Sequence, residues 1–403
     1  MKRPKKYFLS FVFFLCSLFC FAQRAKIDSL QKLLLTQKED TNKVKTLNIL
    51  CSENISIDSY KNAVQNANDA IILATKLHYQ IGIGKAYNWL GVIYQDEGNF
   101  PESLKNLFVA LKIHEKINNK GGIATAYNNI ANIYGQQQNH VDALKYHSLC
   151  LQMWKYLKVK KRIAWASYSV SHDYEALAII QKDDSLLSIA LSYLNESLEI
   201  FNESENQKGI ADSYNSIGSI LYNQRNYPEA LKKFNYSLAI SKKSNMKYGI
   251  AQSYINIGET YLKLDNIVEA NNYLYTGLQL SKELNYKQFI RESYYNVAEL
   301  DSVQGNYKSA YENYKMYIIY NDSLLNEENT KKSVRIAMQY EFDKKETQAK
   351  AEQDKKDAVA AAESRKQRII LFSVIGGLLL VVLFARFIYR SLIQIKKKNI
   401  HIT

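Results

Sequence analysis

Proline and glycine are scarce in this chain. Its 403 residues include three prolines and fifteen glycines, well under half of the roughly 12% that these two types usually make up. Folds built from many short strands need turn residues every 8 to 12 positions or so. The sequence cannot supply them, which excludes an all-β fold and favours a mostly helical one. Because 47% of the residues are hydrophobic, the chain can bury a core, and global disorder is excluded as well.

A basic surface on the body of the protein is also missing, although the formal net charge is +14. Nucleic-acid binding needs a basic patch on a folded face, and here the excess of cations lies at the two ends of the sequence. The body between these ends is close to balanced, so we expect no nucleic-acid partner. The terminal cations are Lys2, Arg3, Lys5, Lys6, Arg386, Arg390, Lys396, Lys397 and Lys398.

Cysteine is rare, with four residues. Cys16 and Cys20 lie in an apolar N-terminal run and follow bulky residues, unlike a lipoprotein cysteine. Cys51 and Cys150 fall at small-residue positions of the repeat described below. We therefore expect them to be buried free thiols rather than a disulfide.

Motifs that carry chemistry are absent. The sequence contains no phosphate-binding loop, no zinc-ligand spacing and no serine nucleophile elbow. Six histidines are present, and the most suggestive is His172, which precedes Asp173. A surface or core role for this histidine is expected more often than a catalytic one. The sequence therefore predicts no enzyme activity, no cofactor and no metal.

The N-terminus has the features of a secretory signal peptide. Four cations precede an apolar run from Tyr7 to Phe21, and the small residue Ala22 precedes a polar one. We expect residues 1–22 to be removed by cleavage after Ala22. An uncleaved anchor helix is the alternative.

A second apolar run, from Ile369 to Ala385, contains seventeen residues without a charge. That is close to the roughly 17–25 residues that span a bilayer, and a snorkelling Arg386 extends the segment to about Tyr389. We predict a transmembrane helix over residues 369–389, with a buried core helix as the alternative. Together with the signal peptide, it would anchor the protein in the cell inner membrane, with the body periplasmic and a basic tail, residues 390–403, cytoplasmic.

The body repeats itself. A small residue follows an aliphatic one at intervals of mostly 40 residues, and a second small residue lies twelve positions later except in the fourth unit, which has seven extra residues. The first series is Cys51, Gly91, Ala131, Ser171, Gly218, Gly258 and Ala298. The second series is Ala63, Ser103, Ala143, Ala190, Ala230, Ala270 and Ala310.

The pattern of each unit predicts a pair of antiparallel helices, which we call helix A and helix B. In helix A a large residue lies four positions before the small one, so the two share a face, and the small residue lets helix B approach closely. Helix B opens after an asparagine such as Asn99 or Asn226, with Pro101 and Pro228 in the first turn, where no hydrogen bond is lost. One hairpin cannot bury its apolar faces alone, so the hairpins are expected to stack into a solenoid.

The units resemble the tetratricopeptide repeat (TPR), whose usual period is 34 rather than 40. The resemblance covers about Thr41 to Asn321 and implies an all-α solenoid of about seven hairpins within residues 23–321. We expect the six extra residues to lengthen helix B and the following turn. The matching positions are Tyr87, Leu90, Gly91, Tyr94, Ser103, Leu107, Ala110, Tyr254, Ile257, Gly258, Tyr261, Ala270, Leu274 and Gly277. Ser167, His172 and Asp301 depart from the pattern.

Asparagine recurs one position after the large residue of helix A. It is only a middling helix former, but it can donate and accept hydrogen bonds at once, which suits the backbone of an extended peptide. Superhelical TPR domains grip peptides by such an asparagine ladder, so the resemblance implies a peptide groove here. The alternative is that the amides bond between neighbouring helices or to water. The expected groove residues are Asn48, Asn88, Asn128, Asn215 and the aromatic residues Trp165, Tyr168, Tyr222 and Tyr295, with His172 nearby.

Residues 322–368 are expected to form a charged helical stalk, because they are rich in alanine and in charges of both signs. Val334, Met338 and Phe342 hint at a coiled-coil seam. The order of segments resembles the sensor half of bacterial TPR-containing histidine kinases and related membrane regulators. In those proteins an effector domain follows the span, whereas this sequence ends at Thr403. We expect either a protein without an effector or a truncated relative.

Two functions follow from the sequence. The first is a membrane-anchored, non-catalytic module that binds a protein or peptide ligand in its groove. The second is the receptor part of a signal-transduction system, in which binding moves the stalk and the span, and a separate cytoplasmic or membrane partner responds. The sequence does not name the ligand.

Overall fold

The computed structural model describes residues 24–324 and 327–400, and all the regular structure within them is helical. This confirms the all-α prediction. The expected signal peptide, residues 1–22, lies outside the described residues. A helical segment over residues 24–36 precedes the first hairpin.

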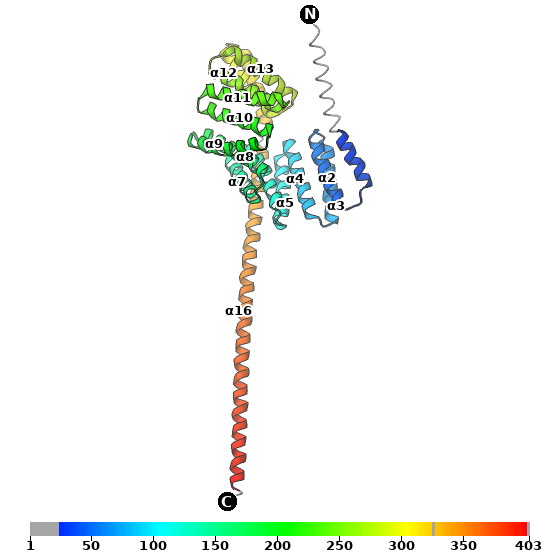
Figure 1. Ribbon diagram of the computed structural model, residues 1–403, viewed down its shortest axis with the longest axis vertical. Coiled ribbons are helices and arrows are strands. Elements are labelled where there is room, and N and C mark those ends of the chain that lie inside the picture. The colour runs from blue at the N-terminus through cyan, green and yellow to red at the C-terminus, as the bar shows by residue number, and fades with distance from the viewer. Residues whose placement is uncertain (1–23, 325–326, 401–403) are drawn as a thin grey trace. The chain divides into compact units, whose positions relative to one another are not determined.

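Seven helical hairpins follow one another between Thr41 and Leu324 (Figure 1). The A helices are α2 (Thr41–Ile55), α4 (Gln80–Asp96), α6 (Lys120–Gln136), α8 (Lys160–Gln181), α10 (Gln207–Asn223), α12 (Lys247–Lys263) and α14 (Lys287–Val303). The B helices are α3 (Tyr60–Lys76), α5 (Phe100–Lys116), α7 (His140–Leu157), α9 (Ser185–Glu203), α11 (Tyr227–Lys243), α13 (Ile267–Glu283) and α15 (Tyr307–Leu324).

The 40-residue period is divided evenly between the two helices of a hairpin. In the second hairpin, α4 and α5 each have 17 residues, and so does α6 after them. Three residues join α4 to α5, and three join α5 to α6. The extra residues are therefore not concentrated in helix B and its turn, and that expectation is wrong. Keeping both helices equally long lets each stay in contact with its partner along its whole length.

The turns share one backbone geometry. One residue of each turn has a left-handed backbone: within residues 41–324 eleven residues other than glycine adopt it, and Gly98 and Gly305 adopt it at φ 79° and 78°. At Gly98 the next amide, Asn99 N–H, donates to Tyr94 C=O over 2.8 Å, which caps the end of α4. The Asn99 side chain then accepts from Glu102 N–H and caps α5. One short loop thus ends one helix and starts the next.

Small residues line the contact between helices A and B, as the two sequence series predicted. A Cβ added at Gly91 would lie 2.5 Å from Leu107 of the partner helix, and Ser103 Oγ donates to Gly91 C=O. The second series is fully buried from Ala63 to Ala270, while Ala310 of the last hairpin is half-buried. The repeat frame read from the sequence is confirmed.

Cys51 and Cys150 are buried free thiols, as expected. Burial raises the pKa of both to about 12. They therefore pack as small apolar groups and are protonated at neutral pH.

The fourth hairpin is longer than the others. Helix α8 has 22 residues and α9 has 19, and the turns after α8 and after α9 keep three residues each. The seven extra residues predicted between Ser171 and Ala190 are thus helical. At the end of α8, Ile179 and Ile180 are exposed.

Helices A form the inner surface of the array. A helices of neighbouring hairpins pack on one another from α2 to α6 and again from α8 to α14, while the B helices pack chiefly on A helices. The side on which neighbouring helices come closer is the concave side of a curved stack. We call the surface of α4 to α14 formed by the A helices the inner surface.

Helix α16 (Glu327–Ile400) is continuous over 74 residues. The chain divides into two compact units, one ending at Ile336 and the other beginning at Ala337. In the first unit, Ser333 is fully buried, and Gln137 Nε2 donates to its hydroxyl over 3.0 Å. The second unit is helical through residue 400, as the stalk prediction required.

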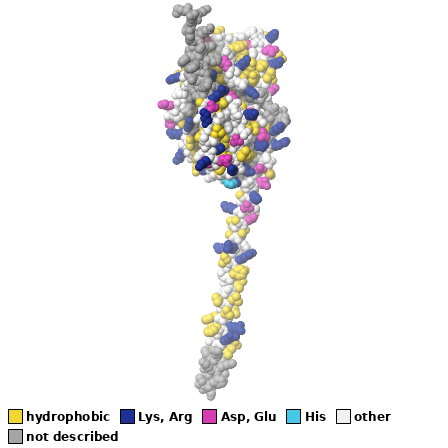
Figure 2. Space-filling view, turned by 90° about the vertical axis from the view of Figure 1, so that its right-hand side faces the viewer, with side chains coloured by type: hydrophobic (Ala, Val, Ile, Leu, Met, Phe, Trp, Pro, Cys, Tyr) yellow, Lys and Arg dark blue, Asp and Glu magenta, His cyan; other side chains and the backbone are white. Residues whose placement is uncertain are grey.

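The apolar part of α16 is fully exposed. The helix contains a segment long and apolar enough to cross a membrane, and none of that segment is buried within the structure. Figure 2 shows it as a band of hydrophobic side chains with lysine and arginine on both sides. By length and composition, the apolar run is therefore a candidate membrane span.

Candidate functional site

The expected ladder asparagines all lie on A helices, and each already makes one hydrogen bond within the protein. Asn48 Nδ2 donates to Val44 C=O within α2. Asn88 is nearly buried and accepts a hydrogen bond from Asn129 of the next hairpin over 3.2 Å. Asn128, half-buried, donates to the same Asn129.

The bonds between hairpins follow a fixed register. Asn129 donates to Asn88, and Asn256 donates to Asn215 over 3.1 Å. In each pair the donor lies two positions after the large residue of its helix, and the acceptor lies one position after the large residue of the preceding A helix. Ser216 meets Tyr168 in the same register. These polar side chains therefore join consecutive A helices along the inner surface.

Sequence reasoning missed the second row of this register. Its amides, at Asn129, Asn256 and Asn296, lie one residue beyond the predicted ladder. Their recurrence at one repeat position was visible in the sequence and would have found them. The acceptor position across from Asn296, on α12, holds Ile255, which has no amide. The Asn296 side chain bonds to Glu259 instead. At this hairpin the row of polar side chains therefore includes the carboxylate of Glu259.

The aromatic residues predicted for the groove divide into two groups. On α8, Trp165 packs edge-on against Tyr168 and Phe201, and His172 Nε2 lies 3.0 Å from Tyr168 Oη. On α10 and α14, Tyr222 donates to Glu259 over 2.8 Å, and Tyr295 is 46% exposed. Tyr295 is therefore the predicted aromatic residue with the most surface open to a ligand.

Asp173 pairs with a different histidine from its sequence neighbour. His147 Nδ1 of α7 lies 2.6 Å from the Asp173 carboxylate, and His147 Nε2 lies 3.2 Å from Asn132 Oδ1 of α6. Burial pushes the pKa of Asp173 up, but the hydrogen bond of His147 and the nearness of the His140 ring outweigh it and leave that pKa below its ordinary value. This group joins α6, α7 and α8 and has the contacts of a structural ion pair.

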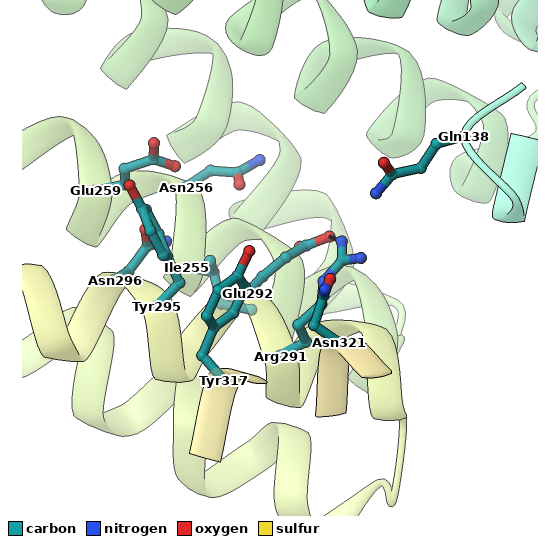
Figure 3. A pocket seen from close by; sticks show the side chains of 10 residues that line it. All are labelled: Gln138, Ile255, Asn256, Glu259, Arg291, Glu292, Tyr295, Asn296, Tyr317 and Asn321. Carbon is teal, nitrogen blue, oxygen red and sulfur yellow. Dashed lines mark hydrogen bonds and ion pairs between the residues drawn. The ribbon is translucent and has the colours of Figure 1, made fainter. Parts of the chain in front are cut away.

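A cavity of about 320 Å³ opens on the inner surface between α12, α14 and α15. It is lined by Gln138, Ile255, Asn256, Glu259, Arg291, Glu292, Tyr295, Asn296, Tyr317 and Asn321. Figure 3 shows Glu259, Asn256, Asn296 and Tyr295 at one end, and Gln138 on the turn before α7 at the other. Hydrogen-bonding and aromatic groups converge there on a space of ligand size.

A family model described as tetratricopeptide repeat matches residues 82–155 and 209–283. These two stretches are therefore similar to the tetratricopeptide repeat. They include the second, third, fifth and sixth hairpins, and the longer fourth hairpin lies between them. A search of curated proteins found no match.

Several solved structures share the fold. The apo form of RapI is 17% identical, with a TM-score of 0.58 over 70% of this chain and 98% of that one. A Rap protein complexed with competence and sporulation factor is 15% identical, with a TM-score of 0.55 over 75% and 92%. The Rap conjugation gene regulator of plasmid pLS20, in complex with the Phr* peptide, is 11% identical, with a TM-score of 0.50 over 74% and 94%. At these identities the likeness is one of fold.

Proposed function

We propose that this protein is a membrane-anchored TPR module that binds a peptide or an extended protein segment on its inner surface and works by binding alone. The observation that carries the proposal is the cavity of about 320 Å³ among α12, α14 and α15, which continues a band of amide, hydroxyl and aromatic side chains along the A helices. Two neighbours of the same fold were solved with a factor or a peptide bound, which supports a peptide as the ligand class.

An array of short synthetic peptides tests this function. The full chain in detergent micelles should bind a subset of the peptides, and Asn88→Ala with Asn128→Ala should weaken the best of them by roughly tenfold, since each lost hydrogen bond is worth about 0.5–1.5 kcal/mol. The matched control is Asn195→Ala with Asn202→Ala, on the exposed side of α9. Binding to no peptide would refute the proposal. A loss of several degrees in melting temperature, with binding unchanged, would make the ladder amides purely structural.

The proposed topology places residues 23–368 in the periplasm and the tail, residues 390–403, in the cytoplasm. The charges flanking the apolar part of α16 support this orientation. A reporter active only in the cytoplasm should therefore work when fused after Thr403 and fail when fused after Asn321. Activity at Asn321 with none at Thr403 would reverse the orientation.

One contact favours the receptor as a second candidate function. The first turns of α16 reach the turn between α6 and α7, where Gln137 bonds to the buried Ser333, and the same helix continues into the apolar segment. A ligand that moves α6 relative to the first turns of α16 would break this contact. The two functions differ in whether residues 390–403 have a signalling partner.

A further inference from the structure

The cavity between α12 and α14 holds more negative than positive charge. Glu259 accepts from the neutral hydroxyl of Tyr222, and the nearby ammonium group of Lys263 bonds instead to Glu299, over 2.7 Å. Glu292 has one guanidinium beside it, that of the adjacent Arg291, at 3.5 Å. Among the residues that line the cavity, two carboxylates thus face one cation.

Both carboxylates are held in surroundings that disfavour their charge. Burial raises the pKa of Glu259, although the Tyr222 hydroxyl and the Lys263 charge act in the opposite direction. Burial likewise raises the pKa of Glu292 against the charge of Arg291, and the charge of Glu259 adds to the rise. A further cation between them would stabilise the ionised forms that burial penalises.

Two tyrosine rings form another wall of the same space. The ring centroids of Tyr295 and Tyr317 lie 5.3 Å apart, with the planes inclined by 59°, and Figure 3 shows the Tyr317 ring beside Glu292 and the Tyr295 ring toward Glu259 and Asn296. The face of an aromatic ring attracts a cation within about 6 Å of its centroid. Carboxylates and ring faces select the same kind of group, an ammonium or a guanidinium.

We propose that this cavity is a subsite for one cationic group of the bound peptide, with Glu259 and Glu292 as its counter-charges and Tyr295 and Tyr317 beside it. The inference rests on the proposed peptide binding and adds its specificity. A cavity of about 320 Å³ is at the small end of the range for ligand sites, about 300–1,000 Å³. It accommodates one long side chain or a peptide amino terminus rather than a folded partner.

The charge along the A helices also gives the ligand a direction. One position of helix A, six residues before the small residue, is a lysine in the first two hairpins and an acid in the fifth and seventh. The residues at this position are Lys45, Lys85, Thr125, Trp165, Asp212, Gln252 and Glu292. The cationic end of the peptide therefore lies toward α14, and any acidic residues lie toward α4.

The test is a positional peptide library presented to the full chain in detergent micelles, with each peptide made both with a free and with an acetylated amino terminus. We expect bound peptides to share lysine or arginine at one position, or a free amino terminus if that is the cationic group. Glu259→Gln with Glu292→Gln should abolish this preference and weaken the best cationic peptide by about tenfold or more. Glu283→Gln, on the exposed side of α13, should leave the preference for a cation and the affinity for the best cationic peptide unchanged.

The outcomes separate the subsite from peptide binding itself. Peptides bound without any preference for a cation, or a preference that survives the double substitution, would overturn the subsite while the proposed function stands. Binding of no peptide would overturn both. Should the double variant unfold, Tyr295→Leu replaces it, because this half-exposed ring can be removed without opening the core, and the same loss of cation preference is expected.

Discussion

Gly258→Leu should strongly destabilise the sixth hairpin. A Cβ at this position would lie 2.7 Å from Leu274 Cγ and 3.0 Å from Leu274 backbone nitrogen. A side chain can turn aside, but the backbone of α13 cannot move without separating the two helices. Overpacking of this kind costs about 1–3 kcal/mol or more, and neighbouring hairpins share the loss because the array folds cooperatively. The measurement is denaturant unfolding of the full chain in detergent, followed by circular dichroism.

Gly135→Leu is the matched control for that prediction. Gly135 also lies in an A helix, α6, but a Cβ there would meet nothing within 4 Å. Leucine is also a better helix former than glycine by somewhat less than about 1 kcal/mol, so this variant should be as stable as the parent or slightly more so. Equal midpoints for Gly258→Leu and the parent would show that the repeat frame is misplaced.

Asp173→Ala should be at least as costly, for an electrostatic reason. The carboxylate is 4% exposed and lies 2.6 Å from His147 Nδ1. Removing one partner of a buried pair leaves the other without its counterpart and costs about 3–5 kcal/mol. Asp184→Ala, at an exposed position in the same hairpin, should change the unfolding free energy by less than about 0.5 kcal/mol. Equal losses for the two variants would contradict the assigned role.

The same pair predicts how stability depends on pH. The pKa of Asp173 in the folded state lies below its ordinary value of 3.8, so its contribution to stability is complete above that pH. It is lost as the pH falls through the folded-state pKa. The difference in unfolding free energy between the parent and Asp173→Ala should therefore narrow as the pH falls below about 3.8. A difference that stays the same in acid would show that the carboxylate acts through packing alone.

The hairpins could be predicted from the sequence because each contact between helices A and B leaves a local mark. A small residue such as Gly91 or Ala270 recurs where two backbones approach, and asparagine recurs where helix B begins. Both patterns arise from contacts within a single hairpin, so they recur at the period of the repeat and can be recognised in the sequence.

The polar contacts could not be read in the same way, because they depend on which residue lies across from each donor. Asn88 lay in the predicted row, yet its partner is Asn129, 41 residues away, and a period of 40 does not point to that position. Asp173 bonds to His147 of the preceding helix rather than to the adjacent His172. The cavity was beyond prediction for the same reason, since Gln138 and Tyr295 come together only through the curvature of the stack.

The long fourth hairpin limits how the array can be shortened or extended. Units of 40 residues are interchangeable because the apolar stripe has the same rotational position about the helix axis at the start and at the end of each unit. Helix α8 has five residues more than the 17 of α6, which at 3.6 residues per turn rotates its last side chains by about 140° relative to that common angle. Removing one 40-residue block from either side therefore preserves the phase of the remaining hairpins. A cut that joins part of α8 to part of another A helix would turn its apolar stripe away from the core.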